Sequence, residues 1–246
     1  MSAEQTRQAW ALASRKYLEE YAETLAQARE ARLESVEEQL LAGPVAGAVV
    51  AHPMSGHGVD DAALARLGAA EVIGLDYSPA AVTSARRRAE ELGLPCRYLT
   101  AELPDSGLAT ASVDVVYTGK GALIWVPDLA AFLTEMRRIL RPGGVLFVYE
   151  AHPLVPLWTW EPGQVRVRED RSYFARSHVN DTFPAGGATE HQHTLAELVT
   201  AVLAAGFTLE HLAEHPEPFW KPEHLDAVAA WDGRVPNSFS LLARRS

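Results

Sequence analysis

Three short segments hold residues able to grip a nucleotide-like ligand, and each follows an apolar run typical of a buried strand. In residues 50–58, Gly56 and Gly58 let the backbone approach a ligand at the start of a helix. Asp76 follows Gly58 at roughly the spacing at which nucleotide-binding folds hold a ribose through its hydroxyls. Glu102 comes after a third apolar run, where an acidic side chain and nearby amides can contact an adenine edge. Together these residues predict a site for an adenosyl group.

Such a site needs parallel strands that end at one edge of a sheet. Short apolar runs alternate along the chain with segments of helical periodicity, and short turns that contain Gly or Pro separate them. This alternation is typical of a doubly wound α/β fold with a mostly parallel sheet. The pattern predicts strands at 45–51, 71–75, 97–100, 113–117, 145–149, 207–213 and 237–243, and helices at 59–67, 79–92, 129–140 and 194–205.

Two regions of the chain depart from this alternation. Residues 4–41 contain no Gly or Pro and repeat apolar side chains at helical spacing, which predicts one or two amphipathic helices stopped at Gly43-Pro44. Residues 152–188 are broken by several prolines, which predicts an irregular excursion over one edge of the sheet. The expected division is a helical lid at 1–43 and an α/β domain at 44–246 with an insertion at about 152–193.

The composition narrows the classes of partner. The chain has 246 residues, 48% of them hydrophobic, and a formal net charge of −10, which argues against binding a phosphate backbone. Its single cysteine, Cys96, cannot form an intramolecular disulfide, and no apolar run approaches the length of a membrane span. The polar N-terminus lacks the apolar centre of a secretory signal. We therefore expect a cytoplasmic protein with a small-molecule partner, no nucleic-acid or membrane partner, and an oligomeric state that the sequence leaves open.

Five segments follow one another in the order of the motifs of a known family: Gly56-His57-Gly58, 75–79, 101–104, 112–117 and 137–144. As an ordered set they resemble the class I S-adenosylmethionine (SAM)-dependent methyltransferases of the small-molecule type. The resemblance implies a Rossmann-like, seven-stranded, mostly parallel sheet with helices on both faces, SAM as the cofactor, and an N-terminal helix that closes over it. It also implies methyl transfer to nitrogen or oxygen of a small metabolite. The Ala- and Arg-rich composition and the variable aromatic lid suit an enzyme of specialised metabolism.

The resemblance carries the family's cofactor contacts onto matching positions of this chain. These are Tyr17 on the lid, His52, Met54, Ser55, Gly56, Gly58, Asp76, Tyr77, Ser78, Ala101, Glu102, Leu103 and Gly119. His52 stands where the family usually has Asp or Glu, and Met54 replaces its first glycine. His52 is therefore either a substituted cofactor neighbour or a histidine that caps a buried strand. Lys120 either touches the cofactor's methionine part or is solvated.

Methyl transfer depends mainly on alignment, which can lower a barrier by about 7 to 11 kcal/mol. A general base is needed only when the acceptor arrives protonated. Glu150, His152 and His193, with His191 as a further candidate, lie near the expected ligand-facing rim, although for each of them the sequence favours a solvated or structural polar residue over a catalytic one. His191 and His193 are two residues apart, so on a strand they would lie on the same face, as metal ligands can. No third ligand is evident, so no metal is expected.

Aromatic residues of the excursion, Trp158, Trp160, Tyr173 and Phe174, either roof the acceptor site or pack under a long loop. Two other functions remain open. A NAD-dependent oxidoreductase predicts a third glycine at position 61, where Asp61 stands, and Asp60-Asp61 suits the charged first turn of a helix. A SAM-binding protein that transfers no methyl group would carry the same motifs.

Overall fold

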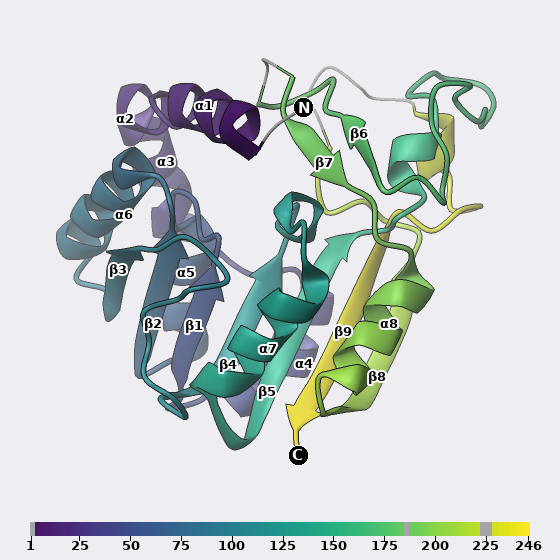
Figure 1. The fold of residues 1–246 in the computed structure, drawn as a ribbon. Coiled ribbons are helices and arrows are strands. Elements are labelled where there is room, and N and C mark those ends of the chain that lie inside the picture. The colour runs from purple at the N-terminus through teal and green to yellow at the C-terminus, as the bar shows by residue number, and fades with distance from the viewer. Residues whose placement is uncertain (1–2, 185–186, 222–227) are drawn as a thin grey trace.

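A seven-stranded sheet forms the centre of the computed structural model, which describes residues 3–184, 187–221 and 228–246 apart from the side chains of Ala3 and Tyr17. The strand order is β3-β2-β1-β4-β5-β9-β8, and β9 runs antiparallel to both of its neighbours (Figure 1). The strands are β1 (Val49–Pro53), β2 (Glu71–Asp76), β3 (Cys96–Thr100), β4 (Val113–Gly119), β5 (Leu140–Ala151), β8 (Phe207–His215) and β9 (Ser238–Arg245). This arrangement confirms the mostly parallel, seven-stranded sheet that the resemblance implied.

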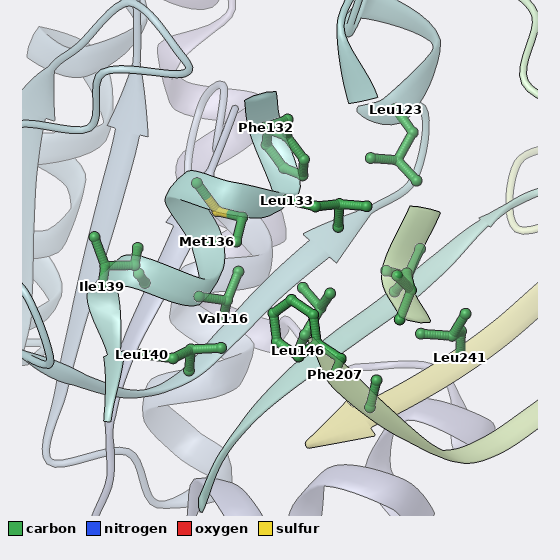
Figure 2. Close-up of a cluster of buried hydrophobic side chains, with 14 of the residues drawn as sticks. Val116, Leu123, Phe132, Leu133, Met136, Ile139, Leu140, Leu146, Phe207 and Leu241 are labelled. Carbon is green, nitrogen blue, oxygen red and sulfur yellow. The ribbon is translucent and has the colours of Figure 1, made fainter. Parts of the chain in front are cut away.

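Helices cover both faces of the sheet (Figure 1). One face packs against α4 (Ser35–Val45), α5 (Val59–Leu67) and α6 (Pro79–Leu92), and the other against α7 (Leu129–Ile139) and α8 (Leu195–Ala204). Figure 2 shows the second layer, in which Phe132, Leu133 and Met136 of α7 lie over side chains of the sheet such as Leu146. Burial of these apolar faces holds the strand ends in fixed register.

The helices begin and end at local signals that the sequence carries. Ser78 caps α6 by accepting a hydrogen bond from the amide of Ala81, with Pro79 in the first turn. Gly68 and Gly93 end α5 and α6 in the left-handed conformation, at φ 113° and 62°. These caps confirm the predicted bounds of both helices.

The N-terminal prediction was wrong in two respects. Residues 3–45 form four helices, α1 (Ala3–Ala13), α2 (Lys16–Glu19), α3 (Tyr21–Glu30) and α4, and α4 continues through Gly43-Pro44 to Val45. Pro44 lies in the last turn, where its missing amide costs a single helical hydrogen bond, while Leu41 and Val45 are fully buried. The first strand accordingly starts at Val49 instead of residue 45. The expected lid boundary at 43/44 falls inside α4, which packs with the sheet.

The insertion carries a two-stranded antiparallel sheet of β6 (Ser177–Val179) and β7 (Thr189–His191). Helix α1 reaches this sheet, because the hydroxyl of Thr6 accepts a hydrogen bond from the amide of Thr189 at 3.0 Å. The Trp10 ring of α1 lies 5.3 Å from that of Trp125, in the 3-10 turn Leu123–Trp125 after β4. Helix α1 and the insertion therefore meet above the carboxyl ends of the strands (Figure 1).

Within the described ranges, no helix is both long enough and apolar enough to cross a bilayer.

Candidate cofactor and acceptor site

Asp76 joins the three segments that predicted an adenosyl site. One carboxylate oxygen accepts a hydrogen bond from the Gly56 amide at 3.0 Å, and the other accepts one from the Ser78 amide at 2.8 Å. The Asp76 carbonyl accepts a bond from the Ala101 amide at 3.0 Å, which fixes the start of the segment that holds Glu102. Burial raises the pKa of Asp76, and the two amide bonds oppose that shift. Strands β1, β2 and β3 therefore bring Gly56, Asp76 and Glu102 to one edge.

The turn after β1 has the open backbone that an adenosyl group requires. Met54, Gly56 and Gly58 have positive φ angles of 58°, 55° and 75°. A Cβ added at Gly56 would meet no atom within 4 Å, so a ligand can approach this backbone, whereas one at Gly58 would lie 2.5 Å from the Tyr98 hydroxyl. Met54 has a positive φ of the kind that favours glycine, and its side chain packs against the apolar core. The turn and the Asp76 carboxylate thus fit the adenosyl part of SAM.

The other expected cofactor residues are distributed around this edge. Ser55 is buried and its hydroxyl has no partner among the described residues, while Ser78 is occupied as the cap of α6. Glu102 forms an ion pair with Arg7 of α1, which ties the adenine-side loop to the lid. Tyr77 precedes Ser78, Leu103 follows Glu102, and Gly119 ends β4 against the carbonyl of Tyr149. The Tyr17 side chain lies outside the described residues.

His52 ends β1 and is almost completely buried. Its Nδ1 lies 2.6 Å from Oδ1 of Asp61, in the first turn of α5. Burial alone would lower the pKa of His52, but the neighbouring Asp61 carboxylate raises it above its ordinary value. Asp61 is fully buried, so it is more than the solvated first-turn charge that its sequence position suggests.

Lys120 belongs to a second, partly buried network of charges beside His52. Its Nζ lies 2.7 Å from Oδ1 of Asp60 and 3.0 Å from Oε2 of Glu37. The Tyr117 hydroxyl donates to the other Glu37 oxygen at 2.6 Å. Both carboxylates raise the pKa of Lys120 against the effect of burial. Sequence reasoning missed Glu37, because its one local signal is a capping box with Glu34 at the start of α4.

A cavity of about 570 Å³ lies at the other half of the same edge, beyond the ends of β5 and β9. The insertion supplies most of its wall. Its lining includes the aromatic residues Trp158, Trp160, Trp220 and Phe239 and the histidines His152, His178, His191 and His193. Strand β4 lies between β1 and β5, so the cofactor edge and this cavity adjoin along the sheet. This is the crevice in which open α/β sheets bind ligands.

Charged side chains that line the cavity are compensated within the described part of the chain. His178 lies 2.8 Å from Glu190, and Asp181 lies 2.6 Å from Arg168 and 3.1 Å from Arg171. Because burying an unpaired charge is costly, such a wall favours an uncharged ligand. No group of three His, Cys, Asp or Glu side chains suited to a metal ion occurs among the described residues.

Glu150 lines the cavity but holds a loop. Its carboxylate accepts hydrogen bonds from the amides of Gly121, Ala122 and Leu123 at 2.6 to 2.7 Å, and from Ala151 at 3.2 Å. Burial raises the pKa of Glu150, and these amide bonds oppose the shift. With its oxygens engaged, Glu150 is placed as the anchor of the turn after β4.

His152 is also held on both ring nitrogens. Nδ1 accepts from the Leu154 amide at 3.2 Å, so the proton resides on Nε2, which donates to Glu214 at 2.8 Å. Burial lowers the pKa of His152, and the Glu214 carboxylate partly opposes this. Its geometry suits an anchor of the insertion.

His193 has the geometry of a general base. Its Nε2 lies 2.8 Å from the Val126 carbonyl, which only accepts, so Nε2 carries the proton and Nδ1 keeps a lone pair. No described residue bonds to Nδ1. His191 stands on the same wall without a described hydrogen bond, and burial, followed by the nearby His193, lowers its pKa.

Comparison with known proteins agrees with this geometry. Residues 54–148 match the family described as "Methyltransferase domain". This match, together with the similar proteins described below, supports the assignment of this domain to the class I SAM-dependent methyltransferases. SAM is the cofactor of this class, and the open turn at Gly56 with the Asp76 carboxylate fits its adenosyl group.

Methyltransferase phqN of Penicillium fellutanum is 27% identical over 187 residues, which cover 73% of this chain and 52% of that protein. The chain thus spans about half the length of this curated relative. Among solved structures, a SAM-dependent methyltransferase from Mesorhizobium loti is similar with a TM-score of 0.65 and 24% identity, over 85% of this chain and 96% of that one. The 4+2 cyclase SpnF is similar with a TM-score of 0.58 and 18% identity, over 85% and 79%. These two likenesses concern the fold of the methyltransferase domain.

Replacement of Asp76 by alanine is expected to weaken binding of S-adenosylhomocysteine by about 1 to 3 kcal/mol, because hydrogen bonds to a charged group are lost. Titration calorimetry of the wild type and the variant measures the difference. Asp232→Ala, which removes an exposed partner of Arg234, is the control and should bind normally. Equal affinities of wild type and Asp76→Ala would show that the carboxylate does not hold the ribose.

His152 makes stability depend on pH in a predictable direction. Because its folded pKa is lowered, its contribution is complete above the unfolded value of about 6.5 and is lost as pH falls below it. Urea unfolding at pH 7.5 and 5.5 should therefore show a loss for the wild type that exceeds that of His152→Gln by up to about 1 kcal/mol. Parallel losses in both proteins would contradict this assignment.

Proposed function

We propose that this protein transfers the methyl group of SAM to an oxygen or nitrogen of a bulky, mainly apolar, uncharged small molecule. The observation that carries the proposal is the adjacency of two sites on one sheet edge. Gly56 and Asp76 form the cofactor side, and the cavity of about 570 Å³ forms the acceptor side. A cofactor and an acceptor that meet near the ends of β1 and β4 would occupy both sites at once.

The acceptor class follows from the cavity wall. Three tryptophans offer broad apolar contact, and the volume suits a molecule of several rings. The two arginines of the wall, Arg168 and Arg171, are paired with Asp170 and Asp181, so neither is free to pair with a carboxylate-rich or phosphorylated acceptor. The formal net charge of −10 likewise supports a small molecule over a nucleic acid.

When bound, SAM supplies a methyl carbon already activated by its positively charged sulfur. The chain's task is then to align the acceptor, exclude water and remove one proton. We assign proton removal to Nδ1 of His193, which would take the proton from the acceptor's hydroxyl or amine. The acceptor's oxygen or nitrogen would gain the methyl carbon as the bond from that carbon to sulfur breaks, which leaves S-adenosylhomocysteine. The Val126 carbonyl keeps the imidazole in the tautomer that this role requires.

A second candidate function is SAM binding without methyl transfer. The similarity to a structure described as a 4+2 cyclase favours it, because the same fold carries a differently named activity there. The substitutions His52 and Met54 in the turn after β1 point the same way. The oxidoreductase alternative loses support, because Asp61 is buried against His52 where a dinucleotide fingerprint needs a third glycine.

Incubation with methyl-labelled SAM and a panel of acceptors tests the proposal. The panel should contain multi-ring phenols and amines, each paired with an analogue that adds a carboxylate to the ring system. We expect labelled product from uncharged members and little from the charged analogues. Tight binding of S-adenosylhomocysteine with no product from any acceptor would favour the second function, and binding of NAD instead would refute both.

A further inference from the structure

We infer that Asp61 supplies, through His52, the negative charge that the family carries at the end of β1, and that this pair recognises the ammonium group of the cofactor's methionine part. This inference rests on the proposed cofactor site. Asp61 is a positioning residue in this scheme, and His52 is the group that meets the cofactor.

The contact between His52 and Asp61 shows which ring nitrogen of His52 remains for a ligand. The 2.6 Å approach of Asp61 Oδ1 to His52 Nδ1 requires a proton on Nδ1, because a carboxylate only accepts. The other ring nitrogen, Nε2, has no hydrogen-bond partner among the described residues. The Tyr117 ring meets the imidazole edge-on at 4.8 Å, which limits its rotation. Nε2 is therefore the nitrogen left for a ligand, and without its proton it can accept from an ammonium group.

Burial explains why Asp61 needs His52. Asp61 has no exposed surface, and the group beside its second oxygen is the uncharged hydroxyl of Tyr98 from β3. His52 is the one described cationic side chain within ion-pair distance of it. A buried carboxylate without a cation is costly, so in the free protein His52 is the cation of this pair and carries a proton on both Nδ1 and Nε2. The raised pKa of His52 agrees with this state.

The groups around the pair leave an excess of negative charge. The side chains that act on His52 or lie beside it are Asp60 and Asp61 from α5, Glu37 from α4, Tyr117 and Lys120 from β4 and its end, His57 from the turn, and Asp76 from β2. Lys120 is already compensated by Asp60 and Glu37, so it is not available to an anion. A cationic group is therefore favoured next to His52, and its arrival displaces the proton from Nε2.

The number of protons released when S-adenosylhomocysteine binds distinguishes recognition of the ammonium group from a purely structural role of the His52–Asp61 pair. S-adenosylhomocysteine is titrated near pH 7 in two buffers of different ionisation enthalpy. The wild type should release close to one proton, and Asp61→Asn should release none and bind at least about 10-fold more weakly. Asp232→Asn is the control, because it removes an exposed carboxylate that pairs with Arg234 and does not act on His52, and it should keep the proton release.

A charge exchange provides the decisive variant. His52→Asp alone places two carboxylates together and should lose binding, whereas His52→Asp with Asp61→Asn restores the family's acid and should bind within about 3-fold of the wild type without proton release. Urea unfolding checks that the double variant is folded. If the folded double variant binds no better than Asp61→Asn, the inference is overturned.

A cofactor analogue tests the same point without substitutions. S-adenosylhomocysteine that lacks the amino group should bind the wild type at least about 10-fold more weakly than the parent, and equal affinities overturn the inference. If the wild type binds neither compound, the proposed function fails instead. If it binds S-adenosylhomocysteine with no proton release and no preference for the amino group, the inference alone fails.

Discussion

His193→Gln should lower kcat for a hydroxyl acceptor by at least about 100-fold while changing KM little, because it removes a positioned base. Glutamine can still donate to the Val126 carbonyl, so the wall keeps its shape. Single-turnover measurement with labelled SAM reports the chemical step directly. An acceptor that is already deprotonated at the assay pH needs no base, so the variant should methylate it at close to the wild-type rate.

His191→Gln is the matched control, since His191 stands on the same cavity wall and bonds to no described carbonyl. It should lose far less activity with either acceptor. If His193→Gln slows the protonated and the deprotonated acceptor equally, His193 positions the acceptor and removes no proton.

Glu150→Gln should reduce the free energy of unfolding by about 2 to 4 kcal/mol, because hydrogen bonds from buried amides to a carboxylate are lost. The side-chain NH2 group of glutamine donates and cannot accept, so whichever way the side chain is oriented, at least one of the amides of Gly121, Ala122 and Leu123 faces another donor. Urea unfolding measures the change. Glu214→Gln, at a half-exposed carboxylate paired with His152, should cost less than about 1 kcal/mol. A similar small loss in Glu150→Gln would return Glu150 to the list of candidate bases.

The strands and helices of the sheet domain were predictable because their signals are local. Ser78-Pro79 and Gly93 bound α6 within the sequence itself, and the apolar run after Glu71 needs no distant partner to be read as a strand. The run through Pro44 was misread because the burial of Leu41 and Val45 against the sheet outweighs one lost helical bond. Tertiary packing of this kind is not visible in the local pattern.

The site residues also divide into those that the sequence predicts and those whose roles depend on distant contacts. The positions of Gly56, Asp76 and Glu102 follow from strand order, so the sequence alone predicts their common edge. The roles of Glu150 and His193 depend on the amide and carbonyl groups that meet them from the segment after β4, and no motif encodes those contacts. Asp61 looked like a first-turn charge because its partner, His52, is the residue that departs from the family pattern.

Helix α1 contacts both the cofactor side and the acceptor side of the sheet edge. Arg7 pairs with Glu102 beside the cofactor turn, Thr6 bonds to Thr189 of the insertion, and Trp10 packs on Trp125. A movement of this helix that admits one ligand therefore also loosens the compartment of the other. Entry and exit of cofactor and acceptor are then coupled, so each ligand should tighten the other's binding by the same factor, as linkage requires.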